Sequence, residues 1–188
     1  MIRAFIAVDF PEDIQKEVAD IQRQFVDYGV KLVDPKLIHI TIKFLGDIDD
    51  EQVDAIKNAL QNVHHSPFDA EINGIGVFPD VNHINVIWVG VSPSISRHFE
   101  KLHSAIEEAL MPLKIRADNR KFTAHATLAR VKRLSPAQKR SLINAIREFS
   151  DISLGRMRVD HIKLKKSTLT SDGPIYETLL EVKLDDRR

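Results

Sequence analysis

The sequence predicts an α+β protein of two similar lobes related by a pseudo-two-fold axis, each an antiparallel sheet with outer helices, facing a central cleft. Two observations lead to this prediction. A gapless internal repeat relates residues at about 39–60 to residues at about 125–146. Strand-like and helix-like patterns follow each other in the order β-α-β-α-β-β-α-β-α-β-β. We expect residues 1–188 to form one bilobal domain, because 188 residues with 43% hydrophobic content can bury such a core.

The first half of the chain contains two strand–helix units. The apolar residues 3–8 predict a central strand, and Pro11 then begins a helix that Gly29 ends. Residues 37–45 predict the second strand. Asp49 begins the second helix, because its side chain and the glutamine three residues later can form a capping box.

The second half repeats this scheme after a hairpin. We expect strands at 68–78 and 83–91, a helix from Pro93 to before Pro112, a strand at 122–131, a helix to about Phe149, and strands at 152–166 and 175–184. Ser135 and Gln138 are spaced to form a capping box at the start of the helix that ends near Phe149. The alternation over residues 152–166 predicts one long strand, and a turn at 171–174 connects it to the last strand.

Composition excludes several classes of protein. Lys and Arg number 27, as do Asp and Glu, so any anion-binding surface must be a local patch. The absence of Cys excludes disulfides and thiolate metal sites and suits a reducing compartment. No apolar run approaches the roughly 18 residues that span a bilayer, and residues 1–30 lack a signal-peptide pattern. We therefore expect a cytoplasmic monomer with no membrane partner.

The repeat begins with HITI at residues 39–42 and HATL at residues 125–128. Side chains two apart share a face of a strand, so each copy presents a histidine and a threonine on one face. If the lobes face each other, the cleft holds His39, Thr41, His125 and Thr127. A neutral imidazole can take a proton from water while a charged one protonates a leaving oxygen, and hydroxyls can bind phosphate oxygens. This set favours phosphoryl chemistry.

Arg130 lies five positions after His125, so strict alternation would place it on the opposite face. A bulge at the strand end could redirect its guanidinium to bind a phosphate, and the alternative is a solvated charge. Its equivalent in the first copy is Phe44. We expect Phe44 to pack in the core, as we do Phe78 and Phe122, with stacking on a base as the alternative.

The two His-x-Thr-x motifs resemble the signature of the 2H phosphoesterases, and most of all the RNA 2′,3′-cyclic phosphodiesterases, also called 2′-5′ RNA ligases. The segments MIRAFIAVDFP, HITIKFLGD, GIGVFP and HATLARV resemble that branch, and the resemblance covers nearly the whole chain. It implies hydrolysis of RNA 2′,3′-cyclic phosphate ends to 2′-phosphomonoesters and, in reverse, 2′-5′ RNA ligation. It also implies a bilobal fold, with His39 as the proton donor, His125 as the proton acceptor, and Arg130 at the phosphate.

Other readings stay open at this point. The protein could be a non-catalytic module that binds RNA ends, or a phosphodiesterase acting on small cyclic nucleotides. A basic rim for the RNA backbone, or an ordinary solvated surface, could be formed by Lys132, Arg133, Lys163, Lys165 and Lys166. We expect no metal and no cofactor, because no ligand spacing of the i, i+4 kind occurs among His64, His65, His98 and His103.

Overall fold

The computed structural model describes residues 1–116, 121–171 and 173–185. The helices are α1 (Glu12–Gln22), α2 (Asp50–Leu60), α3 (Pro93–Leu110) and α4 (Pro136–Glu148), with short 3₁₀ helices η1 (Arg23–Tyr28), η2 (Pro35–Leu37) and η3 (Met111–Leu113). The strands are β1 (Ile2–Asp9), β2 (Val30–Leu32), β3 (His39–Ile48), β4 (Phe68–Asp80), β5 (His83–Val91), β6 (Ala126–Val131), β7 (Ser153–Val159), β8 (His161–Leu169) and β9 (Pro174–Lys183). No helix in these ranges is long and apolar enough to cross a membrane.

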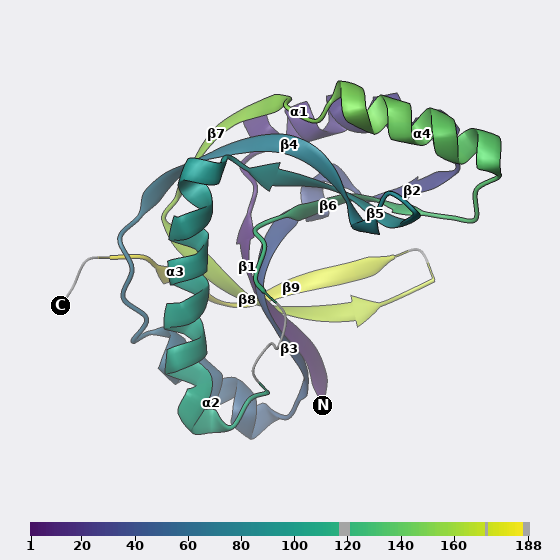
Figure 1. Ribbon diagram of the computed structural model, residues 1–188. Coiled ribbons are helices and arrows are strands. Elements are labelled where there is room, and N and C mark those ends of the chain that lie inside the picture. Colours follow the sequence, from purple (N-terminus) through teal and green to yellow (C-terminus); the bar gives the residue numbers. More distant parts are fainter. Residues whose placement is uncertain (117–120, 172, 186–188) are drawn as a thin grey trace.

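The strands form a curled antiparallel sheet in the order β7-β4-β5-β6-β3-β1-β8-β9, with β2 beside β6 (Figure 1). Its two lobes meet where β3 and β6 pair through one residue each, Ile40 and Ala126. These two residues are equivalent positions of the internal repeat. Antiparallel pairing of equivalent residues is what a local two-fold axis produces, so the axis passes beside this pair. The two predicted lobes are confirmed, and their sheets are continuous through this single pair.

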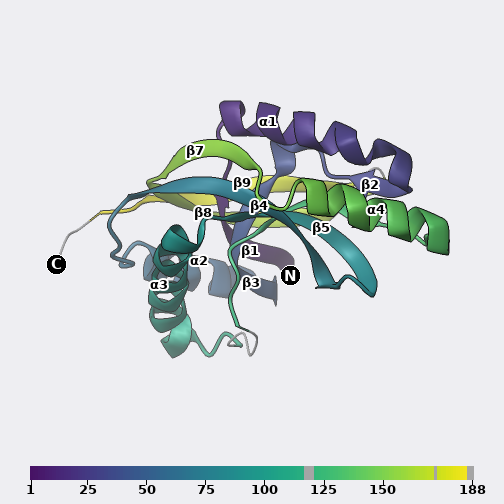
Figure 2. The ribbon, with the colours of Figure 1, turned by 45° about the horizontal axis from the view of Figure 1, so that its top comes forward.

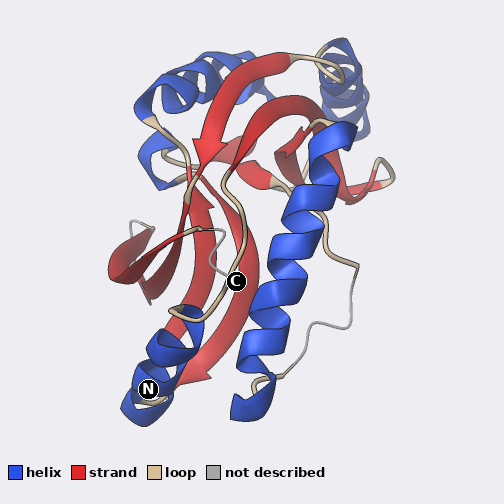
Figure 3. Cartoon of the chain, turned by 90° about the vertical axis from the view of Figure 1, so that its left-hand side faces the viewer, coloured by secondary structure: helices blue, strands red, loops and turns tan. Residues whose placement is uncertain are grey.

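The helices cover the outer faces, as predicted, and two of them are exchanged between the lobes. Figures 1 and 2 show α1 and α4 side by side over one lobe and α2 and α3 over the other. Helix α1 follows β1 but packs on β7, and α3 follows β5 but packs on β3 as well as on β4. Figure 3 shows the strands curving between the two helix pairs. Each lobe therefore depends on a helix that follows a strand of the other lobe.

Both helices that follow the motif strands begin with the same cap. The Asp49 side chain accepts from the Gln52 backbone N–H at 2.8 Å, and the Gln52 side chain accepts from the Asp49 N–H at 3.1 Å. Ser135 and Gln138 form the equivalent capping box before α4. Such caps stabilise a helix start by about 1 kcal/mol. The capping boxes predicted from the sequence are thus confirmed.

The predicted long strand at 152–166 is wrong. The chain forms two strands that are separated by one residue, Asp160: β7 pairs with β4 in one lobe, and β8 pairs with β1 in the other. The apolar alternation continues across Asp160 because both strands have a buried face, so periodicity alone does not reveal the crossing. The sequence analysis also missed β2, which is too short to show a period. In the predicted turn at 171–174, residue 172 lies outside the described residues.

Candidate active site

The four motif side chains surround the pair that joins the lobes. Ile40 and Ala126 are fully buried on the outer side of the sheet, so their neighbours point to the opposite face, here called the site face. His39, Thr41, His125 and Thr127 are all half-buried on this face. Antiparallel pairing places His39 and His125 on a diagonal, a relation that sets residues about 7–8 Å apart. The structure therefore brings together the four residues that the repeat predicts.

Both imidazoles are fixed in the same way. The Nδ1 atom of His39 lies 2.7 Å from the carbonyl oxygen of Leu37, and the Nδ1 atom of His125 lies 2.7 Å from the carbonyl oxygen of Thr123. A carbonyl oxygen only accepts, so each Nδ1 carries the proton of this hydrogen bond. In each imidazole, Nε2 is thus the nitrogen that can gain or lose a proton as the ring titrates.

Burial lowers the pKa of both histidines below the ordinary value for an imidazole. For each, the bond to the backbone carbonyl opposes this effect. The pKa of His39 is lowered further by the charges of Lys165 and His125, while Asp9 opposes them. The charge of His125 is thus one of the charges that disfavour protonation of His39.

A bulge turns Arg130 onto the site face. Trp88 of β5 pairs with Thr127, and the preceding Ile87 pairs with Ala129, so β6 has an extra residue at Leu128. Leu128 and Ala129 are consecutive and both buried, which breaks the alternation of the strand. Arg130 is exposed; burial raises the pKa of Tyr176 in the other lobe, and the Arg130 charge opposes that rise. The bulge that would redirect the Arg130 side chain toward the site face is thus present.

The first copy contains the same bulge. Ala7 pairs with Thr41 and Ile6 pairs with Lys43, so Ile42 is the extra residue of β3. Ile42 and Lys43 are consecutive and both buried. Phe44, the equivalent of Arg130, is 64% exposed, so its predicted place in the core is wrong. The prediction of core packing assumed an unbroken strand. The bulge instead turns the Phe44 side chain to the opposite face of β3.

A buried glutamine holds the bulge of the second copy. Gln22 of α1 is only 2% exposed, and its Nε2 donates to the carbonyl oxygens of Leu128 at 2.8 Å and Val33 at 2.7 Å. The sequence analysis missed this residue. Gln22 lies four positions after Val18 on the apolar face of α1. A polar residue on the apolar face of a helix is the signal by which the sequence could have identified it.

Aromatic rings pack against both imidazoles. Phe5 stacks on His39 with ring centroids 4.8 Å apart, and Tyr176 meets the same imidazole edge-on at 5.3 Å. Phe78 contacts His125 edge-on at 4.7 Å, and Trp88 lies 6.2 Å from it. Phe78 is only half-buried, so its predicted core position is wrong. Phe122 is half-buried and packs against the core, as predicted, and its ring stacks on His103 of α3.

Most of the predicted basic rim is engaged in ion pairs. Lys165 is buried, and its Nζ lies 2.5 Å from Oδ1 of Asp9, whose Oδ2 is 3.3 Å from Nζ of Lys163. Lys166 pairs with Glu177 at 3.4 Å, whereas the cations at 132 and 133 are exposed after β6. Lys165 therefore belongs to the surroundings of His39 rather than to a rim. Across the described ranges, no three acidic, cysteine or histidine residues are grouped as metal ligands.

Comparison with known proteins agrees with this geometry. The family model of the LigT-like phosphoesterases matches twice, at residues 8–88 and 89–176, so the two matches follow the two halves of the repeat. An RNA 2′,3′-cyclic phosphodiesterase of Methanocaldococcus jannaschii is 38% identical over 96% of this chain and 99% of that protein. A protein of the same name from Archaeoglobus fulgidus is 36% identical over 95% of this chain and 98% of that protein.

Solved structures share the fold. A Thermus thermophilus crystal structure aligns over 100% of both chains with a TM-score of 0.77 and 26% identity. E. coli LigT complexed with 3′-AMP aligns over 97% of this chain and 98% of that one, with a TM-score of 0.79 and 18% identity. The family model, the two relatives and the repeated motifs lead to one assignment: this chain belongs to the LigT-like phosphoesterases, a family of 2H phosphoesterases.

Proposed function

We propose that this protein hydrolyses 2′,3′-cyclic phosphates at RNA ends and leaves a 2′-phosphomonoester. The observation that carries the proposal is the pair of imidazoles beside the Ile40–Ala126 pair, each with Nδ1 bound to a carbonyl and Nε2 available. Two proton carriers around one position are what in-line opening of a cyclic phosphate needs. The names of the relatives at 38% and 36% identity support the same reaction.

In the proposed reaction, water attacks phosphorus while His125 accepts its proton. The bond from phosphorus to the 3′ oxygen breaks, and His39 gives its proton to that oxygen. Thr41, Thr127 and Arg130 hold the non-bridging oxygens, where charge-assisted bonds are strongest. Each proton transfer contributes roughly 10²–10⁴-fold. The choice of His39 as donor comes from the resemblance to the 2H phosphoesterases, because both imidazoles have the same backbone contact.

The electrostatics support a pair of imidazoles that shares one proton. Burial lowers the pKa of both histidines, which keeps a neutral imidazole available as a base. A bound phosphate adds negative charge that favours one protonated imidazole, and that charge then disfavours protonation of the second. The pair therefore holds one proton in the presence of substrate. This is the state that hydrolysis requires.

The same groups can serve 2′-5′ RNA ligation. A 5′-hydroxyl of a second strand then takes the place of water, and its proton goes to His125. The direction depends on concentrations and on how each substrate fits, since no further catalytic group is needed.

We propose that the reaction requires no metal and no cofactor, because the imidazoles supply both proton transfers. Dialysis against a strong chelator should leave the rate unchanged. A loss of activity that only an added metal restores would overturn this part of the proposal.

Phosphorus NMR of an oligonucleotide with a 2′,3′-cyclic phosphate end tests the main proposal. We expect the cyclic resonance to be replaced by that of a 2′-phosphomonoester. An intact ring would favour the non-catalytic RNA-end-binding module, and a 3′-phosphomonoester would contradict the proposed leaving oxygen. A kcat/KM that is as high for a cyclic mononucleotide as for the oligonucleotide would favour small cyclic nucleotides as substrates.

A further inference from the structure

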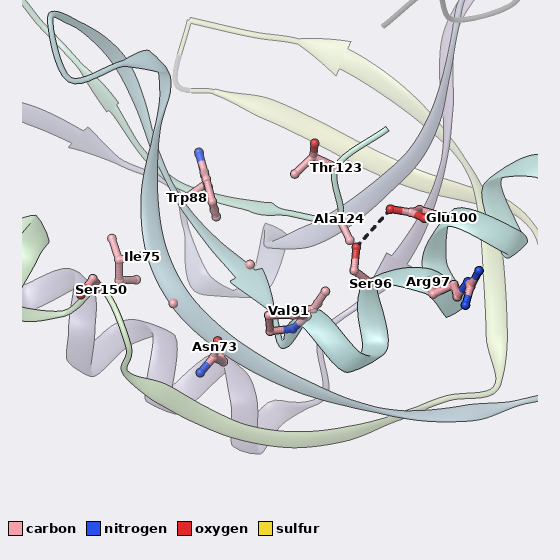
Figure 4. A pocket seen from close by; sticks show the side chains of 13 residues that line it. Asn73, Ile75, Trp88, Val91, Ser96, Arg97, Glu100, Thr123, Ala124 and Ser150 are labelled. Atoms are coloured by element: carbon pink, nitrogen blue, oxygen red, sulfur yellow. Dashed lines mark hydrogen bonds between the residues drawn. The ribbon is translucent and has the colours of Figure 1, made fainter. Parts of the chain in front are cut away.

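A groove of about 560 Å³ opens on the lobe that carries His125 (Figure 4). Trp88 and Gly90 of β5 lie along its floor, and Ser96, Arg97 and Glu100 of α3 form one wall. Thr123, which precedes β6, lines the groove beside Ala124. The mechanism proposed above makes no use of this space.

The groove is continuous with the surroundings of one histidine only. The carbonyl oxygen of Thr123 accepts the Nδ1–H of His125, and the Trp88 ring lies 6.2 Å from the same imidazole. The ring contacts of His39 in the described part of the chain are with Phe5 and Tyr176, and neither of these residues lines the groove. A molecule in the groove would therefore lie on the His125 side of a phosphate held between the two histidines.

The floor of the groove is shaped by a flat indole ring. Gly76 is opposite Trp88 in the β4–β5 pairing, and a Cβ atom there would be 2.2 Å from the ring atom Cζ2 of Trp88. A Cβ atom at Gly90 would be 3.0 Å from Cζ3. Both glycines thus let the indole lie against the strand backbone. The half-buried ring lines the groove, with the Phe78 ring 5.2 Å away at an interplanar angle of 32°. Stacking a base on an aromatic ring is worth about 1–3 kcal/mol.

The in-line geometry of attack on phosphorus indicates which molecule would occupy the groove. Attack on phosphorus comes from the side opposite the 3′ oxygen that leaves, and in the proposed function His125 stands on the attacking side. We propose that the groove binds the first nucleoside of an RNA strand with a free 5′-hydroxyl, which is the acceptor in 2′-5′ ligation. This inference rests on the proposed function and adds to it the site of the second strand.

The atoms of the ligation step balance. The 5′ oxygen of the acceptor bonds to phosphorus of the cyclic phosphate, and its proton passes to His125. The bond between phosphorus and the 3′ oxygen breaks, and His39 protonates that oxygen. The products are a 2′,5′-phosphodiester and a free 3′-hydroxyl.

The groove residues suit a nucleoside followed by a phosphate. The Trp88 ring can stack on the base. The Ser96 hydroxyl and the Glu100 carboxylate, 3.4 Å apart, can bind ribose hydroxyls (Figure 4). Arg97 is exposed and extends away from Trp88, so it is placed for the phosphate that follows the first nucleoside.

Fluorescence tests binding without relying on catalysis, because Trp88 is the one tryptophan of the chain. The probe is a dinucleoside monophosphate with a free 5′-hydroxyl, titrated into the His125→Ala variant. We expect saturable quenching, a Kd that rises about tenfold in a variant that also carries Arg97→Ala, and no change with Arg140→Ala on the exposed face of α4. A Kd unaffected by Arg97→Ala, or competition by adenosine 2′-phosphate, would overturn the proposal.

Ligation tests whether the bound strand reacts. With a cyclic-phosphate trinucleotide as donor, Arg97→Ala should raise the KM for the dinucleoside acceptor about tenfold and leave hydrolysis of the donor within twofold. The same substitution should have little effect when the acceptor is a nucleoside without a phosphate. Hydrolysis with no ligation at any acceptor concentration would overturn this inference and leave the proposed function intact. Failure of hydrolysis itself would reject the proposed function, and the fluorescence titration would still decide whether the groove binds the strand.

Discussion

The two halves of the site share a backbone and differ in what surrounds it. Both have a His-x-Thr-x strand, an Nδ1–carbonyl bond of 2.7 Å and a bulge two residues before Phe44 or Arg130. Around His39 lie Phe5, Tyr176 and the buried Lys165–Asp9 pair. Around His125 lie Phe78, Trp88 and the groove.

This difference shows how a symmetric scaffold can have two distinct roles. The repeated elements fix two imidazoles at equivalent positions. The surroundings then break the equivalence, with a buried cation beside one imidazole and a space for a second molecule beside the other. The different roles proposed for the two histidines would therefore depend on their neighbours rather than on the motif.

The largest effect is expected from the feature that both halves share. His39→Ala and His125→Ala should each lower kcat/KM by roughly 10²–10⁴-fold, since each removes one proton transfer. The double variant should be little worse than the poorer single one, because the remaining imidazole cannot complete the reaction alone. Initial rates and thermal melts of the three variants are the measurement. Near-additive losses would contradict the paired roles.

The residues that follow the two bulges, Arg130 and Phe44, should differ in their effect on activity. Arg130→Ala should lower kcat/KM about tenfold to a hundredfold, mainly through KM, because a charge-assisted bond to phosphate is lost. Arg130→Lys should recover part of it, since the ammonium lacks the bidentate fork. Phe44→Ala and the exposed control Arg133→Ala should change little. Equal effects of Arg130→Ala and Arg133→Ala would make Arg130 a solvated charge.

The bulge of the second half should depend on Gln22. Gln22→Leu leaves the carbonyl oxygen of Leu128 with one fewer donor in a buried place, which should cost about 1–3 kcal/mol in the free energy of unfolding. Urea melts of this variant and of Gln24→Leu, an exposed control two residues later, provide the comparison. Equal stability of the two would show that the bulge holds without Gln22.

The smallest effect is expected in the pH profile. The Lys165 charge lowers the pKa of His39, so Lys165→Met should raise that pKa. If His39 is the proton donor, its protonated form then persists to higher pH, and the alkaline limb of kcat/KM moves up while the acid limb stays. Lys163→Met also removes a partner of Asp9 and serves as the control. A shift of the acid limb instead would make His39 the base.

The sequence predicted the parts of this site that repeat and missed those that depend on contacts between elements. The motif residues followed from alternation within each copy, and both capping boxes from spacing. The position of Phe44 did not, because a bulge changes the face without changing the residue pattern. The break at Asp160 was hidden because both strands beside it are amphipathic. Gln22 acts through a contact 106 positions away, which no local pattern contains.

The exchange of α1 and α3 between the lobes has a consequence for the chain as a whole. A polypeptide cut between residues 88 and 89 would separate α1 from β7 and α3 from β3, and each half would expose the apolar face of its helix. Neither half could bury that face except against the other half or a second copy of itself. The single chain thus has the organisation of a domain-swapped dimer whose two subunits are joined end to end.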